Sequence, residues 1–329
     1  MAILAGVDIG GTKCAVSLAA SGEAGDEAAI LGKRRFPTPG TPEQALKQIG
    51  DALQELLDEQ KDGRLDAIGI SCGGPLDSRR GLVLSPPNLP GWDHIDVVSP
   101  LKARFQAPAA LENDANAGAL AEWRWGAGKG TRNMIFLTFG TGMGAGLILN
   151  GKLYSGTNDQ AGEVGHVRLE HEGPAGYGKA GSFEGFCSGG GIANLARMMA
   201  KAALERGEVP AFCTTGSDLE TITAEKVAQA AHRGDPLARQ VFELVARQLG
   251  RGLAMLVDIL NPERIVIGSI YGRQRDLLEP GMRATLEAEA LPISLAVCEI
   301  VPAGLGERVG DLASLSVAMN ALESGEERE

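Results

Sequence analysis

Short apolar runs and longer stretches of helical spacing alternate along the chain. Apolar runs bounded by glycine or polar residues predict strands at residues 3–9, 13–19, 30–36, 66–71, 109–111, 134–139, 147–151, 264–268 and 296–303. Apolar residues spaced three and four apart predict helices at residues 41–60, 115–126, 187–205, 223–260, 276–290 and 307–322. Since strands and helices alternate from end to end, the pattern predicts the α/β class.

The combination of a strand, a glycine turn and a second strand occurs twice. The first turn, GGT, follows residues 3–9, and the second, GTGMGAG at residues 140–146, follows residues 134–139. No low-complexity linker separates the two copies, so any boundary between lobes lies inside structured chain. We therefore predict two similar α/β lobes with a boundary near Ala117, each of which offers one glycine hairpin.

Composition and charge narrow the class of protein. With 329 residues the chain is long enough for two lobes and a large core. Its formal net charge of −11 argues against a surface that coats nucleic acid. The N-terminal apolar run lacks a basic region and breaks at Asp8, and no run of about eighteen apolar residues occurs, so neither a signal peptide nor a membrane span is predicted. Five scattered cysteines without a CxxC pair indicate buried thiols in a cytoplasmic protein.

The first glycine turn carries candidate chemistry. Gly10, Gly11 and Thr12 at a hairpin tip can aim backbone N–H groups and a hydroxyl at one spot, which suits phosphate oxygens. Asp8, just before the turn, can hold a hydrated Mg²⁺ that faces the same phosphates. The alternative is a tight hairpin whose glycines serve only to adopt positive φ. The segment alone favours neither interpretation.

The second turn, at residues 140–146, is a weak signal by itself, because it fits neither the P-loop nor the dinucleotide-binding fingerprint. Together with the first turn it becomes a candidate for phosphate binding. Two such hairpins that face one another across a cleft would hold the phosphates of a nucleotide from both sides.

An acid cluster follows the predicted strand at residues 109–111. In the run ENDAN, Asp114 is a candidate N-cap of the helix that begins after it. An acid at the carboxyl end of a strand in an α/β protein is also where a general base for a substrate hydroxyl would lie. Both interpretations stay open on these residues.

Residues 162–184 form a glycine-rich stretch with two histidines and several carboxylates. Glu163 and His166, followed by Glu184, would present acceptors and a donor to a polyol. As metal ligands, His166, His171 and the nearby carboxylates lack a familiar spacing. Taken alone, the stretch also fits a glycine-rich surface loop.

In this order, these segments resemble the ROK family of sugar kinases over nearly the whole chain. The matching text is VDIGGTK at 7–13, GGPLD at 73–77, PNLPGW at 87–92, ENDANAGALAE at 112–122, FGTGMGAGLILNGKLYSG at 139–156, GEVGH at 162–166 and NPERIVIGS at 261–269. The resemblance implies the two-lobed actin-like ATPase (ribonuclease H-like) fold with an interlobe cleft. The lobes would be residues 1–117 with 312–329, and residues 118–311.

The resemblance also implies roles for individual residues. Asp114 would be the catalytic base that deprotonates the attacking sugar hydroxyl, and Asp8 would lie near Mg²⁺. The groups that hold or line the sugar would be Gly74, Asn88, Asn113, Glu163, His166 and Glu184. The groups that cradle the phosphates of ATP would be Gly10, Gly11, Thr12, Lys13, Gly140, Thr141 and Gly142. Gly268 would border adenosine.

The chain departs from the family pattern in two places. Most members place three cysteines soon after the GEVGH-type histidine, and with it they bind a structural Zn²⁺. Here those positions hold Ala175, Tyr177 and Ser182, which cannot form a soft tetrahedral site. We therefore expect no structural zinc, and packing through Tyr177 and Phe183 in its place. The second departure is GSI at residues 268–270, where a run of glycines is usual.

The resemblance implies an ATP- and Mg²⁺-dependent kinase of a free hexose or N-acylhexosamine, with the 6-hydroxyl as acceptor. The repressors of the family carry a helix-turn-helix before the first hairpin, and the sequence before Asp8 leaves no room for one. We therefore expect no nucleic-acid partner, and a homodimer, as in many members. The alternative is a sugar-binding regulator or sensor that keeps the fold without turnover.

Overall fold

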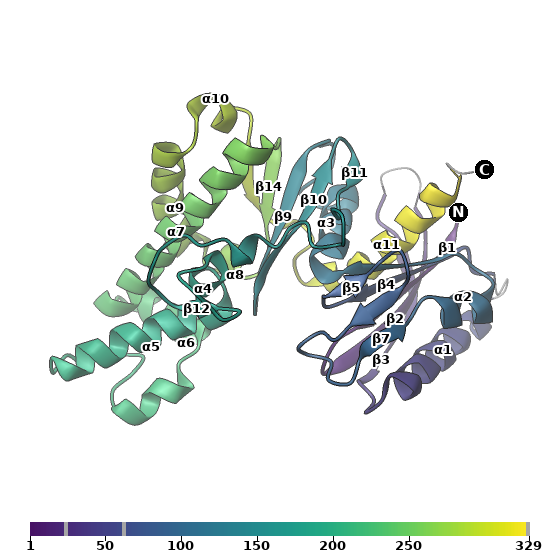
Figure 1. Cartoon of the computed structure of the whole chain (residues 1–329), viewed down its shortest axis with the longest axis horizontal. Coiled ribbons are helices and arrows are strands. Elements are labelled where there is room, and N and C mark those ends of the chain that lie inside the picture. Colours follow the sequence, from purple (N-terminus) through teal and green to yellow (C-terminus); the bar gives the residue numbers. More distant parts are fainter. Residues whose placement is uncertain (23–25, 61–63, 327–329) are drawn as a thin grey trace. The chain divides into compact units, whose positions relative to one another are not determined.

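A computed structural model describes residues 1–22, 26–60 and 64–326 of the chain (Figure 1). The predicted α/β class is confirmed, and the contacts divide the chain into two compact units. The first comprises Met1–Arg132, Gly146–Ala161 and Gly304–Glu329, and the second Asn133–Ala145 and Gly162–Ala303.

The predicted boundary near Ala117 falls inside helix α3 (Asp114–Trp125). The contacts assign this helix whole to the first unit, because it packs against the C-terminal helix α11 (Val309–Glu326) of that unit. The first unit therefore continues past Ala117 to Arg132, and its C-terminal part begins at Gly304 rather than at residue 312.

A five-stranded sheet forms the centre of the first unit, in the order β3-β2-β1-β4-β8. Its strands are β1 (Ile3–Ile9), β2 (Lys13–Ala20), β3 (Ala29–Pro37), β4 (Ala67–Cys72) and β8 (Ala109–Asn113). Strands β1 and β2 and strands β2 and β3 are antiparallel, whereas β1, β4 and β8 run parallel. The register pairs Ile9 with Cys72, and Cys72 with Asn113. Three segments of candidate function, which follow these residues, therefore start at one edge of the sheet.

Helices cover both faces of this sheet (Figure 1). Helix α1 (Pro42–Asp58) begins after Thr41, whose hydroxyl accepts a hydrogen bond from the backbone N–H of Gln44, and it packs with α2 (Ser99–Phe105) on one face. Helices α3 and α11 lie on the other face. There Gly69 lets α11 come close, because a methyl group built on it would lie 2.0 Å from the carbonyl oxygen of Ser314.

The second sheet has the order β11-β10-β9-β14-β15. Its strands are β9 (Met134–Phe139), β10 (Met143–Leu149), β11 (Lys152–Leu153), β14 (Arg264–Ile267) and β15 (Glu299–Pro302). Strands β9, β14 and β15 run parallel in the second unit. Strand β10 carries the chain from the second unit into the first at Gly146.

The helices of the second unit surround a long central helix, α7 (Pro236–Leu260). They are α4 (Phe183–Phe186), α5 (Gly189–Glu205), α6 (Ala224–His232), α8 (Ile270–Arg273), α9 (Arg275–Glu289) and α10 (Pro292–Leu295). The helical region predicted at residues 223–260 is thus two helices. They separate where Asp235 caps α7 by accepting a hydrogen bond from the backbone N–H of Ala238 and Pro236 starts the new helix.

Several short elements were not predicted. In the first unit, β5 (Leu76–Asp77), β6 (Leu82–Leu84) and β7 (Asp93–Asp96) form a small antiparallel sheet. In the second unit, β12 (Ala175–Gly176) and β13 (Lys179–Ala180) form a hairpin. In the part of the chain that the structure describes, no helix has the length and apolar character needed to cross a membrane.

Candidate functional site

The glycine hairpin between β1 and β2 is a closed, exposed turn. The backbone N–H of Gly10 donates to the carbonyl of Lys13, at 3.1 Å, and the backbone N–H of Thr38 donates to the carbonyl of Thr12, at 3.1 Å. Gly11, Thr12 and Lys13 are exposed to solvent. The end of β3 therefore holds the base of the hairpin, while its tip stays accessible to a ligand.

Close approach, rather than positive φ, explains the glycines of this turn. Neither Gly10 nor Gly11 adopts the left-handed conformation. A methyl group built on Gly11 would instead lie 2.2 Å from the carbonyl oxygen of Asn88, and one on Gly10 would lie 2.8 Å from the carbonyl oxygen of Lys13. The interpretation that these glycines serve only to turn the chain is therefore not supported.

Two carboxylates lie near this hairpin and interact electrostatically. The pKa of Asp8 is raised to about 6, mainly by burial and next by the charge of Asp114, while Lys13 partly offsets the rise. Burial likewise raises the pKa of Asp114, although one face of this residue is open to solvent. Two close carboxylates supply the hard oxygen ligands that a hydrated Mg²⁺ prefers, and a cation between them would lower both pKa values.

Asn113, not Asp114, caps helix α3. The side-chain oxygen of Asn113 accepts a hydrogen bond from the backbone N–H of Asn116 at 2.7 Å, and its backbone is extended. Asp114 is the first helical residue, and one of its carboxylate oxygens accepts from the backbone N–H of Ala115 at 2.9 Å. Asp114 is therefore not the N-cap of α3, and its side chain is open to solvent.

The other predicted residues of the first unit lie beside the hairpin. Asn88, in the loop between β6 and β7, is exposed, and its side-chain oxygen would lie 3.2 Å from a methyl group built on Gly73. Gly74, next to Gly73, is exposed as well. The structure thus brings Asn88 to both the phosphate hairpin and the loop after β4.

In the second unit, the hairpin between β9 and β10 contacts a predicted sugar-binding residue. Glu184, on α4, accepts a hydrogen bond from the backbone N–H of Met143 at 3.0 Å through Oε2. A methyl group built on Gly142 would lie 2.9 Å from the same oxygen. One oxygen of Glu184 is therefore committed to the hairpin, and the carboxylate links the predicted phosphate and sugar groups of this unit.

Two further predicted residues, Gly140 and Gly268, also adjoin this hairpin. Gly268 follows β14, and its backbone N–H donates to the carbonyl of Leu137 at 2.9 Å. A methyl group on Gly140 would lie 3.7 Å from the hydroxyl of Ser269. The carbonyl of Gly140 accepts a hydrogen bond from the backbone N–H of Gly189, at the start of α5, at 2.7 Å. Sequence reasoning did not single out Gly189.

Glu163 precedes a short 3₁₀ turn, Val164–His166, whose last residue is His166, and both residues are exposed. The rings of His166 and Tyr177 meet edge to face, with centroids 6.4 Å apart. The backbone carbonyl of His166 accepts from the ammonium of Lys179 at 2.7 Å. Among the described residues, no side chain forms a hydrogen bond with the ring nitrogens of His166, so the imidazole can turn its polar edge to a ligand.

A two-residue β-hairpin stands where the family has its zinc loop. Tyr177 and Gly178 connect β12 to β13, and both have positive φ, as the favoured two-residue turn requires. The side chain of Tyr177 is 75% exposed, so the prediction that it packs the loop in place was wrong; a residue at the tip of such a turn points away from the core. Phe183 is buried as predicted, with its ring against Gly252 of α7.

Ser182 replaces the last cysteine position and is fully buried. Its hydroxyl caps α4 by accepting from the backbone N–H of Gly185 at 3.1 Å, and it donates to the carbonyl of Gly176 at 3.4 Å. Among the described residues, no three or more His, Cys, Asp or Glu side chains are grouped as metal ligands. Ala175 offers no donor atom and the Ser182 hydroxyl is engaged in the helix cap, so the residues present do not fit the family zinc.

A buried polar cluster beside Asp114 was missed by sequence reasoning. Asn116, on the first turn of α3, donates from its amide to Glu112 at 3.0 Å and to the hydroxyl of Ser155 at 3.5 Å. Asp159 is 8% exposed and accepts from both the backbone N–H and the hydroxyl of Ser78, at 2.8 and 2.9 Å. Glu112 and Asn116 both belong to the run ENDAN, but Ser78, Ser155 and Asp159 are far from it in the sequence, so no local pattern relates them to it.

Replacing Glu112 with glutamine is expected to stabilise the protein at pH 8 and to have little effect near pH 4.5. The pKa of Glu112 is raised to about 7, mainly by burial; the hydrogen bond from Asn116 opposes the rise, and the charge of Asp159 adds to it. A raised pKa means that the stabilisation present when the carboxyl is protonated is lost as pH rises from about 4.5 through about 7. Glutamine avoids this loss, which we estimate at about 1–3 kcal/mol.

Urea denaturation of both proteins at the two pH values measures this difference. The matched control is Glu287→Gln, since Glu287 is exposed on α9, and its difference from wild type should be the same at both pH values. If Glu112→Gln and wild type had the same free energy of unfolding at pH 8, ionisation of Glu112 would not destabilise the folded protein.

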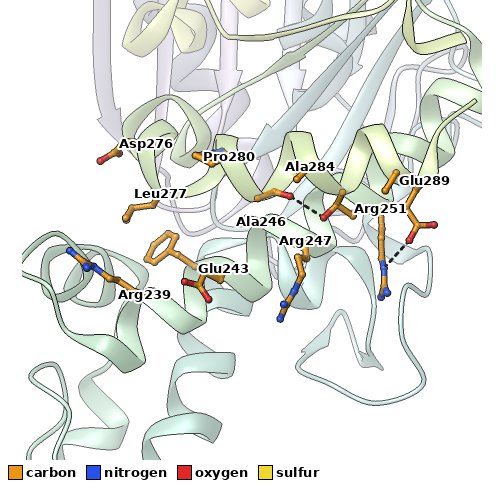
Figure 2. Close-up of a pocket in the computed structure, with 14 residues that line it drawn as sticks. Arg239, Glu243, Ala246, Arg247, Arg251, Asp276, Leu277, Pro280, Ala284 and Glu289 are labelled. Atoms are coloured by element: carbon orange, nitrogen blue, oxygen red, sulfur yellow. Dashed lines mark hydrogen bonds and ion pairs between the residues drawn. The ribbon is translucent and has the colours of Figure 1, made fainter. Parts of the chain in front are cut away.

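A hollow of about 780 Å³ lies between α7 and α9 of the second unit (Figure 2). Charged residues of α7 line it, among them Arg239, Glu243, Arg247 and Arg251, and the guanidinium of Arg251 pairs with Glu289 across it at 3.7 Å. It contains none of the predicted site residues. The size of this hollow therefore gives no support to the predicted site.

Comparison with known proteins gives matches over most of the chain. The family model described as ROK family matches residues 4–319. The glucokinase of Streptomyces coelicolor is 33% identical over 321 residues, 97% of this chain and 98% of that protein. The crystal structure of a ROK family glucokinase from Streptomyces griseus in complex with glucose and AMPPNP has a TM-score of 0.73 at 31% identity and covers 97% of this chain and 99% of its own.

A repressor also matches. The xylose repressor of Caldicellulosiruptor bescii is 30% identical over 230 residues, which are 69% of this chain and 56% of that protein. The likeness to the S. griseus structure confirms the actin-like ATPase fold predicted from the sequence.

Proposed function

Because the chain belongs to the ROK family, we propose that it is a sugar kinase that transfers the γ-phosphoryl group of ATP to a free hexose or N-acylhexosamine. The acceptor is the 6-hydroxyl. One observation carries the proposal: at one edge of the first sheet, the glycine hairpin lies beside Asn88, and Asp8 lies close enough to Asp114 for the two charges to interact. A phosphate cradle, a metal-facing carboxylate and a base are the parts that phosphoryl transfer needs.

The proposed step follows from these positions. The carboxylate of Asp114 takes the proton of the sugar hydroxyl as the hydroxyl oxygen attacks the γ-phosphorus, and the bond to the leaving ADP oxygen breaks. The raised pKa of Asp114 suits a base that must take up a proton and release it again. Backbone N–H groups of Gly11 and Thr12, with Lys13, hold phosphate oxygens. Asp8 would hold a hydrated Mg²⁺, which would supply positive charge to offset that of the phosphates.

Groups of the second unit complete the proposed substrate contacts. Gly140, Thr141 and Gly142 take part in holding ATP phosphates, and Gly268 borders adenosine. Glu163, His166 and Glu184, with Asn113 of the first unit, hold the remaining sugar hydroxyls through acceptors and an imidazole. The glucose in the S. griseus structure and the name of the S. coelicolor relative support a hexose as substrate.

A coupled ADP-release assay tests the proposal over glucose, fructose, mannose, allose, N-acetylglucosamine and N-acetylmannosamine. Sugar-dependent ADP release with one of them is the expected result. The second candidate is a sugar-binding regulator without turnover, which the likeness to the xylose repressor favours. Calorimetric binding of a sugar with no ADP release from any of the six would establish this second function instead.

We expect the purified protein to contain no stoichiometric zinc, and its melting temperature to be unchanged by a chelator. The reason is that main-chain hydrogen bonds and the Ser182 cap hold residues 174–185, where thiolates are missing. Elemental analysis after dialysis, with melting curves recorded before and after EDTA, measures both quantities. One zinc ion per chain that survives dialysis would show that another set of ligands exists.

A further inference from the structure

Asp159 combines two unfavourable features in the loop at residues 155–161. Its φ is +60°, a left-handed conformation that glycine adopts without strain and aspartate at some cost. Its carboxylate is buried, although its loop neighbours Asn158 and Gln160 are exposed. Burying a carboxylate is costly unless it is well bonded. If only the backbone conformation mattered, glycine would be the better residue, so the side chain has a role that offsets both costs.

That role is visible in the hydrogen bonds of Asp159. Both carboxylate oxygens are used by one residue, Ser78, whose backbone N–H and hydroxyl donate at 2.8 and 2.9 Å. Ser78 directly follows β5, and the exposed Gly74 lies just before this strand. The pair therefore fastens the loop at 155–161 to the segment proposed to line the sugar.

A second connection joins the same loop to the first turn of α3. The hydroxyl of Ser155 lies 3.5 Å from the amide of Asn116, and the backbone N–H of Asn116 is bonded to the side chain of Asn113. The loop itself is closed by the backbone N–H of Ala161, which donates to the carbonyl of Ser155 at 3.1 Å. Both ends of the loop are thus tied to elements that carry proposed sugar groups.

The loop ends where the chain leaves the first unit. Ala161 is the last residue of this segment of the first unit, and the carbonyl of Gly162, the next residue, accepts from the backbone N–H of Ala145 at 2.8 Å. Glu163 follows directly. A shift of the loop would therefore be passed through a single residue, Gly162, to a proposed sugar-binding carboxylate.

We propose that Asp159 is a positioning residue for sugar binding: its bonds to Ser78 hold the loop at 155–161, and with it the start of the Glu163 segment, in the arrangement that accepts the sugar. The inference rests on the proposed kinase function for its substrate, while the existence of the clamp rests on the hydrogen bonds alone. Asp159 touches no reacting group, so it affects binding of the sugar and not the chemical step.

The test compares Asp159→Gly with wild type. Glycine keeps the left-handed backbone and removes only the carboxylate. Amide hydrogen exchange of residues 154–163 should become roughly 10- to 100-fold faster, as expected when hydrogen bonds to a charged group are lost. The KM for the sugar should rise roughly tenfold, while kcat and the KM for ATP stay close to wild type.

Ser78 variants and a neighbour provide the controls. Ser78→Ala should give an intermediate effect, Ser78→Thr, which keeps the hydroxyl, should restore wild-type behaviour, and the double variant with Asp159→Gly should be no worse than Asp159→Gly alone. Asn158→Gly adds the same flexibility at an exposed position of the loop and should leave exchange and KM unchanged.

Unchanged exchange in Asp159→Gly would overturn the clamp. Faster exchange with an unchanged sugar KM would overturn the positioning role, since the loop would then move without consequence for the sugar. If wild type turned over no sugar in the assay panel, the proposed function would fail, and the exchange rates would still decide whether the clamp exists.

Discussion

Replacing Asp114 with asparagine is expected to lower kcat by a factor of about 10²–10⁴, the range that general-base catalysis contributes. Asparagine keeps the shape of the side chain and its bond to the backbone N–H of Ala115, but it cannot take a proton from the sugar hydroxyl. Because Asn113 is the residue that caps α3, helix stability should be little changed. Sugar affinity, measured by calorimetry, should stay within a few-fold of wild type.

The matched control is Asp276→Asn, the same change at an exposed residue in the first turn of α9. It should leave kcat unchanged. An Asp114→Asn variant that keeps more than about a tenth of the wild-type kcat would exclude Asp114 as the base, because a positioned base contributes more than that. Loss of sugar affinity along with activity would instead assign Asp114 a role in binding alone.

Replacing Gly11 with alanine is expected to damage ATP and sugar use together. The added methyl group would lie 2.2 Å from the carbonyl oxygen of Asn88, and backbone must move to relieve this overlap. The hairpin is proposed to hold phosphates and Asn88 the sugar, so one methyl group disturbs both. We expect kcat/KM to fall about 100-fold, the effect of a displacement of about 1 Å in a substrate-positioning group. Steady-state kinetics with each substrate varied measures this.

Overpacking should also lower the free energy of unfolding by about 1–3 kcal/mol, which urea denaturation can separate from the kinetic effect. The control is Gly40→Ala, at an exposed glycine with no atom within 4 Å of the added methyl group. Circular dichroism establishes that the Gly11→Ala protein is folded. Wild-type kinetics in a folded Gly11→Ala protein would mean that the hairpin does not approach Asn88 in solution.

Much of the fold could be predicted because its signals are local. The strands of both sheets are short apolar runs that end at glycine or polar residues, and the glycine hairpins between β1 and β2 and between β9 and β10 lie where the turns predicted them. The separation of α6 from α7 was missed although its signals are present: Gly234 and Asp235 stop one helix and Pro236 starts the next. They were overlooked because the apolar residues keep their helical spacing on both sides of the break.

The site was harder to predict where adjacent residues compete for one role. Asn113 and Asp114 are both good N-cap residues, and only the backbone of the structure decides that Asn113 is the cap. The clamp between Ser78 and Asp159 joins residues 81 positions apart, and no spacing rule reaches across such a distance. Tyr177 was misjudged for a third reason: its aromatic ring suggested packing, but its place at the tip of a hairpin turn exposes it.

The hairpin of β12 and β13 affects how the protein responds to oxidants and heavy metals. Residues 162–184 contain neither cysteine nor methionine, so the loop proposed to hold the sugar has no sulfur atom. Thiolates that hold a metal are the groups that peroxide and heavy metals attack first. Four of the five thiols of the chain are buried, and burial raises the pKa of each of these four. Sugar binding by this chain should therefore persist under oxidising conditions that would oxidise the cysteine ligands of a zinc loop and release its metal.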